Sequence, residues 1–156
     1  FKKGTIEVAR PGVAIASAPT AARVPFEWWG ESELMVTGTL NGGRKMKLML
    51  GTGLPGGVGA TQDVLDEIGV KPGSISRAVR NAGAVLQGHA WAQTTIGAAM
   101  IGPVPCDKLT TWAGAFDAYE MWRAGMRRDA LLGPEVWEKR RVVFDWEKSE
   151  LRVESE

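Results

Sequence analysis

The sequence has few of the residues that metal-dependent and nucleophilic enzymes use. Its 156 residues include one cysteine, Cys106, and one histidine, His89. A single cysteine excludes an internal disulfide, and a single histidine excludes a zinc site that needs several histidine ligands. A lone cysteine is more often a small buried residue than a nucleophile. We therefore expect no metal and no cofactor.

Two further absences concern partners and location. The formal net charge is +1, which argues against nucleic acid or an anionic membrane surface as a partner. No apolar run approaches the roughly 18 residues of a membrane span. The chain starts at Phe1 rather than methionine, so we expect it to be excised from a longer precursor. The compartment is unknown; a periplasmic or membrane-anchored location, through a segment upstream of Phe1, is one hypothesis.

Glycine and tryptophan are abundant, with 20 and 7 residues respectively. Many glycines between short apolar runs are typical of a β-rich fold with tight turns. The length suits one folded domain, and no internal repeat is present. Residues 1–23 are rich in alanine and are interpreted as an extended arm. Residues 24–156 are interpreted as a single domain.

The clearest local pattern is a β-hairpin. Residues 34–40 and 45–50 alternate well enough for two strands, and Asn41-Gly42 between them is a strong signal for a type I′ turn. After a glycine-rich loop, Thr61 is a fair N-cap for a short helix over 62–68, which Gly69 would end.

The second half of the chain gives further expectations. A hairpin is predicted over 84–101 with its tip near Gly88 and His89, followed by a short strand over 102–106. A helix is predicted over 116–126, and another over 135–139 with Pro134 in an N1-like position. Segments 141–146 and 150–153 predict a closing hairpin. Residues 110–128 are interpreted as an insertion that serves as a lid or prevents dimerisation.

The loop from Gly51 to Gly56 matches the dinucleotide-binding pattern GxGxxG letter for letter. Its context argues against that function, because the preceding strand belongs to an antiparallel hairpin rather than a βαβ unit. The acidic residue expected about 20 positions later, for the ribose, is also missing.

Three segments in order carry a different resemblance. The first is Val36-Thr37-Gly38-Thr39-Leu40-Asn41-Gly42 followed by Leu48-Met49-Leu50-Gly51-Thr52-Gly53-Leu54. The second is Thr95-Ile96-Gly97 through Val104-Pro105, and the third is Asp129 to Trp137 followed by Arg141-Val142-Val143-Phe144-Asp145. Together they resemble one lobe of a retropepsin-like (clan AA) aspartic peptidase of the bacterial single-lobe type. The resemblance implies an all-β or β-rich closed-barrel lobe with two or three short helices.

The resemblance also assigns roles to residues. The catalytic aspartate of the D-T-G motif falls on Gly51, and Thr52 and Gly53 match the rest of that motif. Contacts to a peptide or protein substrate are implied for Leu54, Gly88, His89 and Trp91, and a structural motif for Leu131, Leu132 and Gly133. In a single-lobe enzyme each protomer of a homodimer supplies one carboxylate.

Gly51 cannot supply that carboxylate, because glycine has no side chain to hold the attacking water or to transfer a proton. We expect the chain to be inactive as a peptidase, whether Gly51 is natural or an introduced substitution. The alternative is a non-catalytic peptide- or protein-binding domain that uses the former substrate cleft. A third possibility is a structural module whose cleft is filled by its own N-terminal arm.

Overall fold

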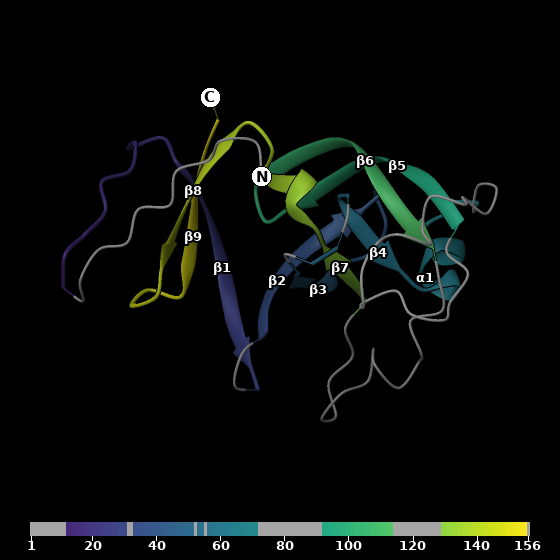
Figure 1. Ribbon diagram of the computed structural model, residues 1–156, viewed down its shortest axis with the longest axis horizontal. Helices are drawn as coiled ribbons and strands as arrows, with labels where there is room; N and C mark the ends of the chain where they lie inside the picture. Colours follow the sequence, from purple (N-terminus) through teal and green to yellow (C-terminus); the bar gives the residue numbers. More distant parts are fainter. Residues whose placement is uncertain are drawn as a thin grey trace.

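The computed structural model describes residues 12–30, 33–51, 53–54, 56–71, 92–113 and 129–155. Strands dominate these residues, in agreement with the predicted β-rich class (Figure 1). The elements in chain order are β1 (Ala22–Trp29), β2 (Glu33–Leu40), β3 (Met46–Leu50), β4 (Val58–Ala60), α1 (Gln62–Glu67), β5 (Ala92–Ile101), β6 (Val104–Ala113), β7 (Ala130–Leu132), the 3-10 helix η4 (Pro134–Trp137), β8 (Arg140–Asp145) and β9 (Glu150–Ser155).

Six of the strands close into a barrel. The ring runs β2–β3–β7–β4–β6–β5 and closes because β2 pairs with both β3 and β5. Closure removes exposed strand edges and lets alternating side chains fill the interior. Buried residues of the barrel strands, such as Leu40, Leu48, Ile96 and Leu132, form the centre of one continuous core.

The β2–β3 hairpin confirms the strongest sequence prediction. Its turn residues Asn41 and Gly42 both have positive φ, at 49° and 74°. This is the combination that a type I′ turn requires. In β3, Met46 and Leu48 are buried while Lys47 between them is not, as the alternation predicted.

The short helix α1 is also confirmed, and it ends one residue earlier than predicted. Thr61 occupies the N-cap position, but its hydroxyl bonds to the Asp63 side chain rather than to a backbone N–H. Gly69 follows the helix with φ 68°, the left-handed conformation that ends helices. Within the described residues, no helix is long and apolar enough to cross a membrane.

The β5–β6 hairpin differs from the prediction. β6 has ten residues instead of a short strand over 102–106, and it pairs with β5 from Ile101↔Val104 to Ala92↔Ala113. Thr110 to Ala113 therefore belong to a barrel strand and are not part of an insertion. The predicted strand over 84–87, the hairpin tip at 88–89 and the helix over 116–126 lie outside the described residues.

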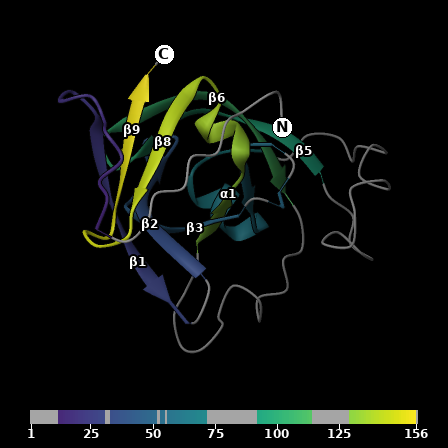
Figure 2. The same ribbon diagram turned by 60° about the vertical axis from the view of Figure 1, so that its left-hand side comes forward.

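A three-stranded sheet extends from the barrel at β1. Residues 26–29 of β1 pair with β2, while residues 22–25 pair with β9, which in turn pairs with β8. The β8–β9 pair is the predicted closing hairpin. In Figures 1 and 2 this sheet lies to one side of the barrel.

Of the arm predicted over residues 1–23, residues 12–21 lie along β8 and β9, whereas Ala22 and Arg23 belong to β1 and pair with β9. The Ala18 N–H donates to a Glu154 carboxylate oxygen at 2.6 Å, and Arg152 donates to the Ser17 hydroxyl at 2.8 Å. The Ala18 hydrogen bond, assisted by Arg141, holds the pKa of Glu154 below its usual value of 4.5. The arm is thus held by contacts to the outer sheet.

A buried carboxylate fixes the entry to β7. Asp129 is 4% exposed; its Oδ1 accepts from the Arg44 guanidinium at 2.7 Å and its Oδ2 from the Lys47 N–H at 2.8 Å. Arg44 also contacts Glu67 at 2.6 Å. The hydrogen bond to Asp129, and then the one to Glu67, raises the pKa of Arg44, so the guanidinium stays charged.

Candidate functional site

Gly51 lies at the end of β3, where the chain enters the glycine-rich loop. Its N–H donates to the carbonyl oxygen of Leu132 at 2.8 Å. A β-carbon built on Gly51 would meet only that oxygen, at 3.8 Å. This is an ordinary van der Waals distance, and Gly51 is not among the glycines with positive φ. The backbone at position 51 therefore accommodates a side chain.

The second part of the site is β7, which carries the predicted structural motif. β7 runs parallel to β3 and antiparallel to β4, so that Leu131 pairs with Met49 on one side and Gly59 on the other. Two segments about 80 positions apart in the sequence thus meet: the loop after Gly51 and the Leu131-Leu132-Gly133 motif.

Gly133 contacts the loop so closely that no side chain fits. A β-carbon there would lie 2.2 Å from the carbonyl oxygen of Gly56 and 2.9 Å from that of Leu54. The Gly133 N–H donates to the carbonyl oxygen of Gly57 at 2.8 Å. Glycine at position 133 is therefore required by the close approach of two backbones.

The returning part of the loop packs against β6. Gly56 has φ 105°, and a β-carbon on it would lie 3.0 Å from Nε1 of Trp112. A β-carbon on Gly57 would lie 2.9 Å from Cβ of Leu109. Glycine at both positions fits this close packing.

Glu135 connects these parts, and sequence reasoning did not single it out. Its Oε2 accepts from the Thr110 N–H at 3.1 Å and its Oε1 accepts from the Thr110 hydroxyl at 3.2 Å. The Glu135 N–H donates to the Gly56 carbonyl at 3.2 Å. The only sequence signal was its place two residues after Gly133, at the start of the predicted helix.

Other acidic residues of the described part have structural contacts. Asp145 accepts from the Lys148 N–H and from Arg152, both at 3.1 Å, so it and Asp129 are both hydrogen-bonded near strand ends. Asp63 and Asp66 are exposed on α1. No group of three or more His, Cys, Asp or Glu side chains that could hold a metal occurs in the described part of the chain.

The remaining predicted site residues are only partly placed. Leu54 is 4% exposed, so its side chain offers little surface to a substrate, and its assigned contact stays a prediction. Gly53 is exposed. Cys106 is buried, as predicted, and accepts from the Arg140 guanidinium at 3.0 Å. Thr52, Gly88, His89 and Trp91 lie outside the described residues.

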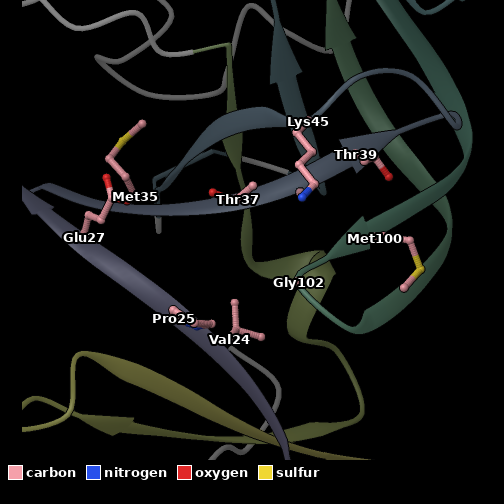
Figure 3. A pocket seen from close by; sticks show the side chains of 10 residues that line it. Val24, Pro25, Glu27, Met35, Thr37, Thr39, Lys45, Met100 and Gly102 are labelled. Atoms are coloured by element: carbon pink, nitrogen blue, oxygen red, sulfur yellow. The ribbon is translucent and has the colours of Figure 1, made fainter.

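A separate hollow of about 360 Å³ opens where β1 and β5 diverge along the same edge of β2 (Figure 3). Thr37 of β2 is one of its lining residues, and the Thr37 carbonyl oxygen accepts from the Gly102 N–H at 2.9 Å. None of the residues lining the hollow belongs to the loop 51–57. They are Val24, Pro25, Glu27, Met35, Thr37, Gly38, Thr39, Lys45, Met100 and Gly102.

No protein-family model and no curated protein sequence matches the chain. Its fold is similar to that in the crystal structure of a retropepsin-like aspartic protease from Rickettsia conorii, with a TM-score of 0.57. The two chains are 15% identical, over 90% of this chain and 95% of that one. The similarity confirms the predicted fold, a closed-barrel lobe of the retropepsin-like type.

Proposed function

We propose that the chain is a lobe of the aspartic-peptidase type in which position 51 is the catalytic position. We further propose that it has no peptidase activity because this position is a glycine. The observation that carries the proposal is the bond from the Gly51 N–H to the Leu132 carbonyl, 2.8 Å long. It joins the segment that resembles the D-T-G motif to the segment that resembles the Leu-Leu-Gly motif. Because both segments resemble one family, their contact supports the assignment of position 51.

The chemistry explains why glycine abolishes activity. Two carboxylates at close range share one proton because like charges there split their pKa values, so one acts as base and the other as acid. Each lobe supplies one carboxylate, which makes peptide or protein substrates the expected class and a second copy of the chain the expected partner. A pair of lobes with Gly51 has no carboxylate at either position and cannot activate water.

The outer sheet offers an edge on which a second copy can pair. Among the described residues β8 pairs only with β9. The Phe26 N–H bonds to the Ser149 carbonyl at 2.9 Å. Backbone N–H and C=O groups alternate in direction along an antiparallel strand. Because Ser149 faces β1, Leu151 and Val153 also face β1, and their partners on β8, Phe144 and Val142, have their backbone groups directed away from β9. No described strand pairs with these groups, so they can bond to another strand.

The test is to replace Gly51 by aspartate and measure cleavage of a mixed peptide library at acidic and neutral pH. The space at position 51 predicts a folded variant that cleaves peptides and is blocked by a statine-type inhibitor. Gly51→Asn is the matched control, since it has the same shape and cannot ionise, and it should remain inactive. Inhibitor-sensitive cleavage by the chain with Gly51 would contradict the proposed role of this position.

The second candidate is a non-catalytic peptide-binding domain. It is favoured by the loop itself, whose backbone is held by Leu132, Gly133 and Glu135 although position 51 has no carboxylate. An extended peptide could bind by main-chain hydrogen bonds, as in strand addition. Peptide binding by the parent chain, with no cleavage after Gly51→Asp, would favour this candidate over the first.

A further inference from the structure

We infer that Glu135 is a positioning residue for the loop that carries position 51. Its carboxylate holds Thr110 on β6, its N–H holds Gly56, and the residue two positions before it, Gly133, holds Gly57. The inference rests on the proposed function as far as catalysis is concerned. The mechanical part, that Glu135 fixes the loop, is independent of it.

The contacts form a closed circuit between three segments. The Gly57 N–H donates to the Thr110 carbonyl oxygen at 3.0 Å, while the Thr110 N–H donates to Glu135 Oε2 at 3.1 Å. The Glu135 N–H then returns to the Gly56 carbonyl at 3.2 Å. One residue, Glu135, thus holds Thr110 through its side chain and the loop through its backbone. A shift of any one of the three segments therefore strains the other two.

The packing around the carboxylate leaves few alternatives for these bonds. A β-carbon on Gly57 would lie 3.3 Å from Glu135 Oε2 and 2.9 Å from Leu109 Cβ. The loop backbone therefore lies directly against the carboxylate and the strand it holds. In η4, beside β6 in Figure 2, Pro134 fixes the backbone just before Glu135.

The consequence concerns the direction in which position 51 faces. Gly51 is tied to Leu132 at the start of the loop, and Gly56 and Gly57 are tied to η4 and β6 at its end. With both ends fixed, a carboxylate at position 51 has a defined orientation. Without the Glu135 carboxylate, Thr110 loses two bonds, and the returning end is held to β6 only by the Gly57 N–H and the pairing of β4 with β6. Its position, and with it the orientation at position 51, is then less closely fixed while the barrel remains.

The first experiment measures amide hydrogen exchange in the parent chain and needs no activity. Glu135→Ala should speed exchange by about tenfold or more at Gly57, whose N–H bonds to Thr110, and at Gly133, whose N–H bonds to Gly57. The reason is that Thr110 loses its two bonds to the carboxylate, which weakens the contacts that depend on it. Val143 and Val153 in the outer sheet should not change. Glu135→Gln should stay near the parent, because a carboxamide can accept from the Thr110 N–H and donate to its hydroxyl.

The controls separate this role from general stability. Glu138→Ala alters an exposed glutamate of the following turn and should change nothing. If Glu135→Ala does not fold, Glu135→Met keeps the side-chain length without acceptors and serves the same comparison. Equal protection of Gly57 and Gly133 in the parent and in the variant without acceptors would overturn the inference.

The second experiment repeats the series in the Gly51→Asp background. Glu135→Ala should lower kcat by about tenfold or more, the effect of a misplaced catalytic group, with little change in KM, and Glu135→Gln should restore it. An unchanged kcat in an active Gly51→Asp, Glu135→Ala chain would overturn the catalytic part. If Gly51→Asp alone is inactive, the proposed function fails, and the exchange comparison by itself decides the role of Glu135.

Discussion

Gly133 and Gly56 approach so closely that a β-carbon on Gly133 would lie 2.2 Å from the Gly56 carbonyl oxygen. The contact joins the end of β7 to the loop that begins at Gly51. It makes one glycine of the site indispensable to the backbone, whereas the glycine at position 51 is not required by packing.

This contrast predicts opposite outcomes for two matched substitutions. Gly133→Ala should destabilise the chain by about 1–3 kcal/mol or more, because backbone atoms must move to admit the methyl group. Gly51→Ala should be neutral or stabilising by up to about 1 kcal/mol, since the site has room and alanine restricts the unfolded chain. Urea unfolding measures both, and equal destabilisation would contradict the packing described here.

The buried carboxylate of Asp129 predicts a second stability effect. Asp129→Ala should cost about 2–4 kcal/mol, because it leaves the Lys47 N–H and the Arg44 guanidinium without their buried acceptor. Glu67→Gln is the control: it removes the exposed partner of Arg44 and should cost less than about 1 kcal/mol. Thermal and urea unfolding should rank the two variants in that order. The reverse order would show that Asp129 is not the main anchor of Arg44.

Attachment of the N-terminal arm should depend on pH. The pKa of Glu154 is lowered in the folded chain, chiefly by the Ala18 N–H, so the contact is complete above the usual value of 4.5. It is lost as the pH falls through the lower, folded value. The Ala18 amide resonance, followed by NMR, should report this transition, and Glu154→Gln should abolish it. An Ala18 resonance that does not titrate in the parent chain would contradict the contact.

The edge of β8 along which no described strand pairs predicts self-association. Antiparallel pairing of two β8 strands would place Arg141 of one copy near Asp145 of the other and continue the sheet across the pair. Light scattering coupled to size exclusion should show a dimer at high concentration. Phe144→Lys should shift it to monomer, because a lysine on an edge strand opposes pairing. The control is Val13→Lys, which alters an exposed apolar residue of the arm and should leave the dimer intact. A parent chain that is monomeric at every concentration would remove β8 as the interface.

The elements that were predicted correctly depend on neighbouring residues. Asn41-Gly42 specifies its turn because few residues adopt positive φ at two successive positions. The helix over Gln62–Glu67 and the hairpin of β8 and β9 follow in the same way from short patterns. The length of β6 did not follow, because Thr110 to Ala113 are a strand only through pairing with β5 and β4.

In the site too, features that depend on local sequence were predicted, and features that depend on distant contacts were not. The motifs around Gly51 and Leu131-Leu132-Gly133 were recognised from the sequence. The requirement for glycine at position 133 was not, because it comes from contact with the Gly56 carbonyl oxygen, 77 positions earlier in the chain. Glu135 was missed because its partner, Thr110, is 25 residues away. Likewise Asp129 and Arg44 are separated by 85 residues, and no local pattern links them.

The sequence by itself determined that position 51 has no side chain, because the identity of a residue does not depend on the fold. It also determined the turn and the strand alternation that place Gly51 at the end of β3. Only the tertiary structure decided that this position has room for a carboxylate, and that Gly133, Thr110 and Glu135 hold the loop around it. Those properties are distances between segments far apart in the chain, and they exist only once the barrel has closed.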